Sequence, residues 1–197
     1  MPKISTTPSE EDVFDAMRDL GSFLDITPSD ARELYTLAHR HALTRLRKSV
    51  RVADLMTAPA ITLAPETTLR EAARVLAEAR ISGAPVTRGR ELLGVVSVKD
   101  FLAALGLPKD APPVALVAWT FAGRACRLEG LESEPVTSVM TAPAMTVCPE
   151  ATAGEAAKLM ADRNIRRLPV IKNGELVGVV THTDLVRAFG DMLEDAQ

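Results

Sequence analysis

Two short segments of the sequence carry side chains suited to binding a phosphate or a ribose. Ser97 and Asp100 follow the apolar run Gly94–Val96, and the same pattern returns at Thr181 and Asp184. A hydroxyl at a helix start lies beside free backbone N–H groups, which suits a phosphate oxygen. An ionised Asp only accepts hydrogen bonds, so it can hold both hydroxyls of a ribose. The spacing is also close to that of a helix capping box, and a purely structural role stays open.

The sequence offers no comparable set of residues for catalysis. The histidines are His39, His41 and His182, and the first two point in different directions on a helix. Cys126 and Cys148 lack the paired Cys/His spacing of a zinc site or of a disulfide scaffold. No nucleophile–base arrangement and no glycine-rich phosphate loop can be read. We therefore predict a protein that is not an enzyme and has no catalytic cofactor or metal.

Both segments belong to an internal repeat, which governs the prediction of the fold. Met56 recurs as Met140, an offset of 84 residues, and Asp100 then falls on Asp184 without any gap. Roughly half of the positions between Met56 and Asp100 are identical to their partners, far more than chance allows. The chain is therefore expected to contain two copies of one structural unit.

Each copy predicts the order β-α-β-β-α. Thr68 with Glu71, and Thr152 with Glu155, form the pattern of a capping box ahead of an amphipathic helix. In the second copy residues 172–174, Lys-Asn-Gly, are a strong signal for a hairpin turn. One copy is too small to bury both faces of its sheet, so the two are expected to pack together. The predicted fold class is α+β, with N-terminal helices and an extra helix between the copies.

The segments outside the repeat are also expected to be helical. Ser9 can cap a first helix, and Thr27-Pro28 can begin a second. Between the copies, Val114–Leu128 is apolar enough for a helix that either packs as a buried element or faces a partner or second copy. The expected organisation is an N-terminal helical segment 1–50, repeat one 51–107, an inter-repeat segment 108–134, repeat two 135–190 and a tail 191–197.

The overall composition points to a reduced, cytoplasmic protein with no membrane partner. The 197 residues are 47% hydrophobic and 25% charged, and the formal net charge is −3. The apolar run from Val114 to Ala122 is too short to span a bilayer. The mild acidity argues against nucleic-acid binding. A local basic patch, made of Arg45, Arg47, Lys48 and Arg51, keeps a nucleic-acid-linked role as an alternative to simple stabilisation of a helix end.

The repeated motifs resemble a known family. Met-Thr-x-Pro, a capped helix, Pro-Val and Gly-Val-Val-Ser/Thr-x-x-Asp occur in this order twice, as in a tandem pair of cystathionine-β-synthase (CBS) domains, also called a Bateman module. The resemblance covers Val52 to about Phe189 except for the inter-repeat segment. It implies two pseudo-symmetric repeats with up to two clefts between them, adenosine-containing ligands such as AMP, ADP, ATP or S-adenosylmethionine, and dimers that act as regulatory sensors.

The resemblance also implies which residues would contact such a ligand. Asp100 and Asp184 would hold ribose, and Ser97 and Thr181 would face phosphate or ribose. The base ends of the clefts would be lined by Thr57, Ala60 and Ile61 and by Thr141, Ala144 and Met145. The walls before each Pro-Val would come from Ser82, Gly83, Ala84 and Pro85 in repeat one and from Arg166, Arg167, Leu168 and Pro169 in repeat two.

These walls differ between the copies in their charge. Arg166 and Arg167 can form charge-assisted bonds to phosphate, whereas Ser82 and Gly83 carry no charge. A pair of solvated surface arginines is the alternative. The sequence thus predicts a non-enzymatic sensor that binds an adenine nucleotide, forms a homodimer and signals to an unknown protein. The rival prediction is a ligand-independent interaction module, and nucleotide titration would separate the two.

Overall fold

The computed structural model describes residues 8–20, 33–41, 50–108, 111–112, 114–122 and 130–194. The chain divides into two compact units, and neither coincides with one copy of the repeat. One unit comprises residues 1–56, 147–168 and 180–197, and the other comprises residues 57–146 and 169–179. Segments from both copies therefore contribute to each unit.

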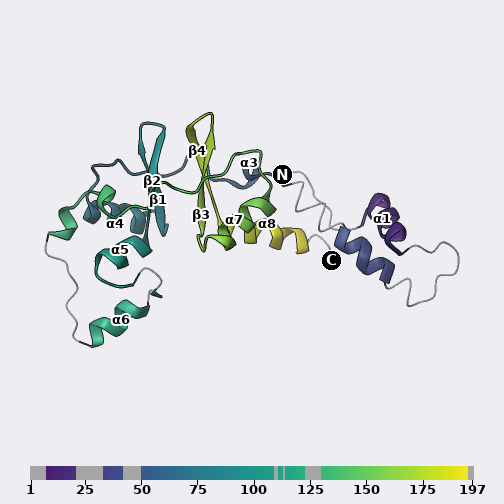
Figure 1. The fold of residues 1–197 in the computed structure, drawn as a ribbon, viewed down its shortest axis with the longest axis horizontal. Helices are drawn as coiled ribbons and strands as arrows, with labels where there is room; N and C mark the ends of the chain where they lie inside the picture. The colour runs from purple at the N-terminus through teal and green to yellow at the C-terminus, as the bar shows by residue number, and fades with distance from the viewer. Residues whose placement is uncertain are drawn as a thin grey trace. The chain divides into compact units, whose positions relative to one another are not determined.

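The secondary structure follows the repeat and confirms the α+β class. The first copy contains α4 (Leu69–Glu78), β1 (Gly83–Arg88), β2 (Glu91–Ser97) and α5 (Val98–Ala104), and the second contains α7 (Ala153–Asp162), β3 (Arg167–Lys172), β4 (Glu175–Thr181) and α8 (His182–Glu194) (Figure 1). The strand expected before α4 is reduced to one isolated bridge, in which Leu63 pairs with Val86 of β1. Its backbone bonds go to Pro85 and Thr87 at 3.0 and 2.9 Å.

Each copy folds back through an antiparallel hairpin. In β1–β2, Gly83 lies opposite Ser97 and Val86 opposite Gly94, with an irregularity in register after Val86. The predicted hairpin between β3 and β4 is confirmed. At its turn Asn173 and Gly174 have φ values of 53° and 83°, the left-handed conformation that an Asn-Gly turn requires.

The helix caps expected from the sequence form to different extents. Thr152 and Glu155 make the complete reciprocal box, and the bonds from Thr152 hold the pKa of Glu155 below its ordinary value. The box at Thr68 is only half formed, which corrects the prediction. The Glu71 N–H donates to the Thr68 hydroxyl at 3.2 Å, but the Glu71 carboxylate lies 3.7 Å from Arg74 in an ion pair.

The unit of residues 57–146 and 169–179 has an apolar core between the β1–β2 hairpin and α4. Its buried side chains are Leu63, Leu69, Ala72, Leu76, Ala84, Val86, Val96 and Val136. The last belongs to η2 (Val136–Ser138), which begins the second copy. Arg90 and Glu175 form an ion pair of 2.8 Å, which raises the pKa of the Arg90 guanidinium.

The other unit is built around α7, α8 and the short helix α3 (Val52–Leu55). The Val52 N–H donates to the Ala151 carbonyl, and the Ala153 N–H to the Val50 carbonyl, both at 2.8 Å. Its buried apolar residues include Val50, Val52, Ala153, Ala156, Met160, Leu168, Val180 and Leu185. The leading segment of the first copy therefore packs with the helix of the second.

Two N-terminal helices belong to the unit of residues 1–56, 147–168 and 180–197. Ser9 caps α1 (Glu10–Leu20) as predicted, with its hydroxyl 3.2 Å from the Asp12 N–H. Residues 33–41 are also helical, and His41 contacts Asp19 at 3.0 Å. The second helix start expected at Thr27-Pro28, and the basic residues 45, 47 and 48, lie outside the described residues. Of that patch the structure describes Arg51, whose guanidinium donates to the Glu150 carbonyl.

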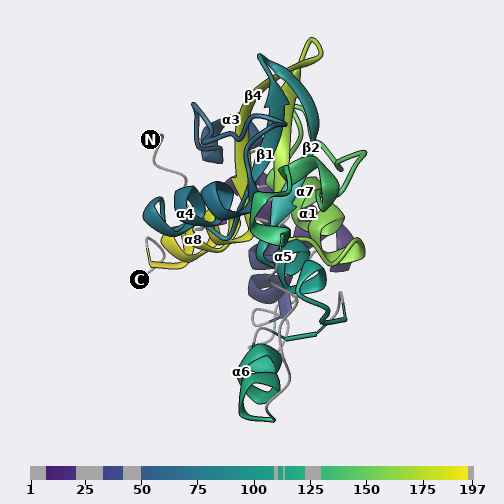
Figure 2. The same ribbon diagram turned by 90° about the vertical axis from the view of Figure 1, so that its left-hand side faces the viewer.

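The helix expected between the copies is present as α6 (Val114–Phe121), and residues 123–129 lie outside the described part. None of its side chains is buried, and Val114 and Phe121 are 66% and 85% exposed. Both views show α6 projecting beyond α5 (Figure 2). The expectation of a buried packing element is therefore wrong for α6, and a role in facing a partner or a second copy stays a prediction. Within the described residues, no helix combines the length and hydrophobicity needed to cross a bilayer.

Candidate functional site

The two carboxylate oxygens of Asp100 have different roles. One oxygen takes part in the cap of helix α5, and the other makes an exposed contact. Its Oδ2 atom accepts from the backbone N–H and the hydroxyl of Ser97, at 2.7 and 2.8 Å. This is the capping role that the sequence left open. Its Oδ1 atom accepts from the Thr141 hydroxyl at 3.2 Å. The cap therefore occupies one oxygen and leaves the other for a group outside the helix.

Asp184 repeats the cap at the start of α8. Its Oδ2 atom accepts from the backbone N–H and the hydroxyl of Thr181, at 2.8 and 2.6 Å. Its Oδ1 atom accepts no hydrogen bond from the residues that the structure describes. A carboxylate oxygen can accept two hydrogen bonds, so this atom is available to an incoming donor. The hydroxyls of Ser97 and Thr181 both donate to a carboxylate, so they can meet a ligand only as acceptors.

Thr141 joins the leading segment of repeat two to the hairpin of repeat one. Its N–H and carbonyl both bond to Val95 of β2, at 2.9 and 3.1 Å. A Cβ on the neighbouring Gly94 would lie only 2.8 Å from the Met140 sulfur and from the Thr141 carbonyl oxygen, so this crossing requires glycine. Ala144 and Met145 follow in the same unit, and Met145 is exposed. The structure thus brings Thr141 to Asp100.

Thr57, Ala60 and Ile61 also lie in the unit of residues 57–146 and 169–179. The Thr57 N–H and carbonyl bond to Val179 of β4, at 2.9 and 3.1 Å, as those of Thr141 bond to Val95. Ile61 is 47% exposed, so its apolar side chain is accessible to a ligand.

Most of the residues predicted for the two walls are buried. Gly83, Ala84, Pro85, Leu168 and Pro169 are buried, because the two Pro-Val strands run through the cores. They can line a wall only through backbone atoms. The polar wall residues are more accessible: Ser82 and Arg166 are exposed, and Arg167 is half-buried.

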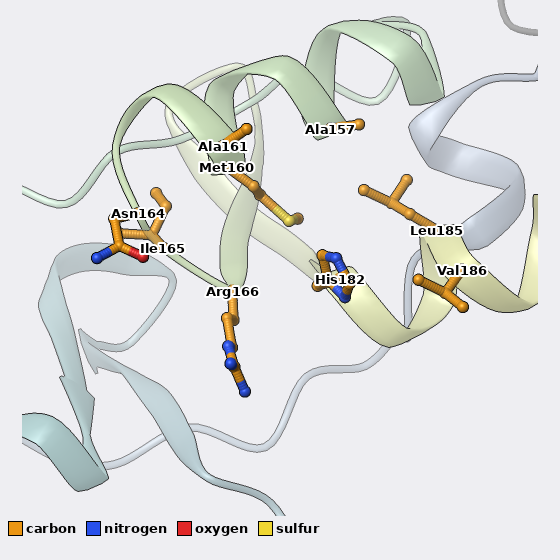
Figure 3. A pocket seen from close by; sticks show the side chains of 9 residues that line it. All are labelled: Ala157, Met160, Ala161, Asn164, Ile165, Arg166, His182, Leu185 and Val186. Atoms are coloured by element: carbon orange, nitrogen blue, oxygen red, sulfur yellow. The ribbon is translucent and has the colours of Figure 1, made fainter. Parts of the chain in front are cut away.

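The structure adds a pocket that sequence reasoning did not identify. It has a volume of about 330 Å³ and lies between α7, the turn after α7, and the start of α8 (Figure 3). Of its lining residues, the sequence pointed to Arg166 but not to Met160, His182 or Leu185. The sequence signal for it was the apolar stripe of α7. Such a stripe does not show whether other side chains cover that face of the helix or whether the face borders a pocket.

The described residues contain no group of three or more His, Cys, Asp or Glu side chains that could hold a metal ion. The side chains of the candidate site offer hydrogen bonds with carboxylates and hydroxyls, and positive charge from arginine. This arrangement can bind a ligand.

The family model of the CBS domain matches residues 52–107 and 136–191, together more than half of the chain. The chain belongs to the CBS domain family. The two matches fall on the two copies, so the protein carries a tandem pair of CBS repeats, as the motifs indicated. The capped Ser/Thr-x-x-Asp segments close the second strand of each CBS repeat.

The chain is similar to part of the length of larger curated proteins. The chain is 36% identical over 126 residues to inosine-5'-monophosphate dehydrogenase of Korarchaeum cryptofilum, covering 64% of this chain and 21% of that enzyme. It spans less than two thirds of the length of the first curated relatives that it matches.

Solved structures are similar over most of the chain. CBSX2 in complex with AMP is 26% identical with a TM-score of 0.57, covering 74% of this chain and 99% of CBSX2. The CBS domain of a CBS domain containing membrane protein from Sphaerobacter thermophilus is 30% identical with a TM-score of 0.58, covering 78% and 96%.

Proposed function

We propose that this chain is a non-enzymatic regulatory module that binds an adenosine-containing ligand and passes the bound state to a partner protein in the cytoplasm. The observation that carries the proposal is the double use of Asp100 and Asp184. In each, one carboxylate oxygen serves the helix cap and the other lies outside it. The likeness to CBSX2, whose structure holds AMP, supports the ligand class.

The proposed ligand residues are those of the two sequence segments and their surroundings. Asp100 and Asp184 bind ribose hydroxyls, and Ser97 and Thr181 accept from the ligand. The adenine base is contacted by Thr57, Ala60 and Ile61 and by Thr141, Ala144 and Met145. Arg166 and Arg167 favour AMP, ADP or ATP over uncharged ligands at one site, because guanidinium groups form strong bonds to phosphate. S-adenosylmethionine is the proposed alternative ligand.

Ligand binding at Asp100 is expected to affect the pairing of the two repeats. A ribose hydroxyl would either share the Oδ1 atom of Asp100 with Thr141, since a carboxylate oxygen accepts two hydrogen bonds, or displace the Thr141 hydroxyl from it. Thr141 belongs to repeat two and is also paired with Val95 of repeat one. A ligand that displaces its hydroxyl therefore acts on a junction between repeats. Regulation requires that two arrangements of such a junction differ in their affinity for the ligand.

Replacing Asp100 or Asp184 by Asn is expected to weaken nucleotide binding by about 1–3 kcal/mol per site, the scale of hydrogen bonds to a charged group. Calorimetric titration of the wild type and both variants with AMP, ADP, ATP and S-adenosylmethionine measures this loss. A ligand present at about 100 times its dissociation constant should also stabilise the wild type by roughly 2.7 kcal/mol in thermal unfolding.

Asp54 provides a control for the loss of charge, since its carboxylate also accepts a backbone N–H, from Arg51. Asp54→Asn should leave nucleotide affinity unchanged. If Asp100→Asn and Asp184→Asn lower stability but bind nucleotide normally, the carboxylates are caps only and the proposed site is wrong. Absence of binding by all four ligands to the folded wild type would remove the sensor function itself.

The exposed helix α6 favours a second candidate function, that of an interaction module. Val114, Val117 and Phe121 are 66%, 47% and 85% exposed, and α6 contains no charged residue. Contiguous apolar surface of this kind is typical of protein contacts. We propose that α6 contributes to a homodimer or to a regulated protein's docking site. In this candidate function, association does not depend on nucleotide.

The triple change Val114→Ser, Val117→Ser and Phe121→Ser is expected to weaken self-association at least about tenfold, a loss of roughly 1.4 kcal/mol or more. Sedimentation equilibrium or light scattering across a concentration series measures it. Tyr35→Ser, which removes an exposed aromatic side chain from the other unit, should have no such effect. A wild type that stays monomeric at tens of micromolar would contradict the homodimer.

A further inference from the structure

Helix α6, which projects beyond α5 in both views (Figures 1 and 2), has an inner and an outer face. The inner face holds the half-buried side chains Ala115, Leu116 and Trp119. An added Cβ on Gly106 would lie 3.7 Å from the Trp119 ring, so the indole lies beside the turn that follows α5. The outer face holds exposed side chains at spacings of three and four residues, namely Val114, Val117, Ala118 and Phe121. This spacing leaves one narrow apolar stripe, which is typical of a seam between two helices.

The outer face of α6 can be buried without leaving a polar side chain unpaired. The helix contains no charged residue. The hydroxyl of Thr120, beside the stripe, donates to the Leu116 carbonyl at 2.9 Å within the same helix. Burial of a polar group is costly only when the group loses its hydrogen bonds or carries a charge. A contact on this stripe therefore gains from apolar burial and has little to offset that gain.

These properties favour a second copy of α6 as the partner of the stripe. In a contact with twofold symmetry the same patch faces itself, so a charge on the patch would meet a like charge. The stripe presents no charge, and its side chains are all apolar. The small Ala118 lies near the middle of the stripe, where it allows two helices to approach closely.

Two features favour an antiparallel pair over a parallel one. Antiparallel helices oppose their macrodipoles, whereas parallel helices place like partial charges side by side. An antiparallel pair also sets Phe121, the largest side chain of the stripe, beside Val114 of the other copy. A parallel pair would crowd the two Phe121 rings at one end and leave the smaller Val114 side chains together at the other.

We infer that two copies of this chain pair through α6 in antiparallel orientation, with Val114, Val117, Ala118 and Phe121 in the seam. The inference rests on the second candidate function proposed above and commits it to one partner. The stripe offers roughly 300–400 Å² per copy, about half of the area of a standard interface. The α6 pair is therefore a weak contact, which sets how two copies face each other and does not hold them together alone.

The test is disulfide cross-linking, which captures weak contacts, in the full chain with Cys126 and Cys148 both changed to Ser. In this background Ala118→Cys places a thiol near the expected symmetry axis. We expect oxidation with copper–phenanthroline at tens of micromolar protein to convert most of this variant to a covalent dimer. Non-reducing gels and intact mass spectrometry measure the product, and circular dichroism checks that each variant is folded.

The orientation is tested by mixing Val114→Cys with Phe121→Cys in the same background. The antiparallel pair brings these two positions together, so the mixed disulfide should exceed either self-linked product several-fold. In that pair the two copies of residue 114 would be about 10 Å apart along the helix axis, beyond the Cα separation of about 7 Å that a disulfide spans. The two variants differ in mass, which identifies the mixed product.

Tyr35→Cys in the same background is the matched control. Tyr35 is 64% exposed, close to the 66% of Val114, but it lies in the other unit. It should form no more covalent dimer than the background without cysteine.

Self-linked products from Val114→Cys and from Phe121→Cys, without the mixed product, would show a parallel pair and overturn the inferred orientation. Cross-linking of Ala118→Cys no greater than that of Tyr35→Cys would overturn the pairing itself. If light scattering then still shows a dimer of the wild type, the proposed homodimer stands and uses another face. A wild type that is monomeric and does not cross-link through α6 would remove both the inference and the homodimer.

Discussion

Replacing Leu168 by Ala is expected to lower the free energy of unfolding by about 2–5 kcal/mol, the range for Leu to Ala in a closed core. Leu168 lies in β3 with 0% of its surface exposed and is among the largest fully buried side chains. The change removes buried apolar surface and leaves a cavity. Urea denaturation followed by far-UV circular dichroism measures the loss.

Leu176→Ala serves as the control for this substitution. Leu176 lies on the neighbouring strand β4 and is only half-buried, so its loss is expected to cost about 1 kcal/mol. A Leu168→Ala variant no less stable than Leu176→Ala would show that the β3 core is open. In that case the Leu168 side chain would be accessible to a ligand, as the family resemblance of the sequence implied.

Replacing Gly94 by Ala is expected to destabilise the protein by about 1–3 kcal/mol, the cost of forcing extra volume into a packed site. The added Cβ would lie 2.8 Å from the Met140 sulfur and 2.8 Å from the Thr141 carbonyl oxygen. The methionine can move, but the carbonyl belongs to the backbone that pairs with Val95. The variant is therefore also expected to loosen the contact between Thr141 and Asp100.

Gly89→Ala tests whether this loss comes from crowding. Gly89 has a φ of 62°, and an added Cβ would have no atom within 4 Å, so its replacement costs only backbone strain of about 1 kcal/mol. Both variants are compared by urea denaturation. Equal losses would contradict the crowding at Gly94. In a double-mutant cycle of Gly94→Ala with Met140→Ala, the coupling energy should account only for the part of the Gly94→Ala loss that is due to the Met140 sulfur.

The capped segments illustrate how far sequence reasoning reached in the candidate site. The spacing from Ser97 to Asp100 allowed either a cap or a ligand contact, because both require the same hydroxyl and carboxylate. The structure shows the cap on one oxygen and the Thr141 hydroxyl on the other. The partner is 41 residues away in sequence, and no local pattern predicts a contact at that distance.

Local sequence patterns also did not predict which of the wall residues are accessible to a ligand. Leu168-Pro169 and Ala84-Pro85 were expected to face a ligand, but their side chains are buried in strands. A short apolar run does not reveal which of its two faces meets a core, since strand side chains alternate and both faces can be covered. The pocket at Arg166 and His182 was missed for a related reason, because it forms only where α7 and α8 meet.

The sequence by itself determined the two CBS repeats, their hairpins and the helix starts at Ser9, Thr152, Ser97 and Thr181. These features rest on interactions within a few residues, and within the repeats the offset of 84 residues made each signal appear twice. The tertiary structure alone decided how segments are shared between units. Val52 bonds to Ala151, and Thr141 to Val95, because the backbone groups of each leading segment find partners in the other repeat. Such pairings depend on chain packing over roughly 40 to 100 residues, which propensity and periodicity do not encode.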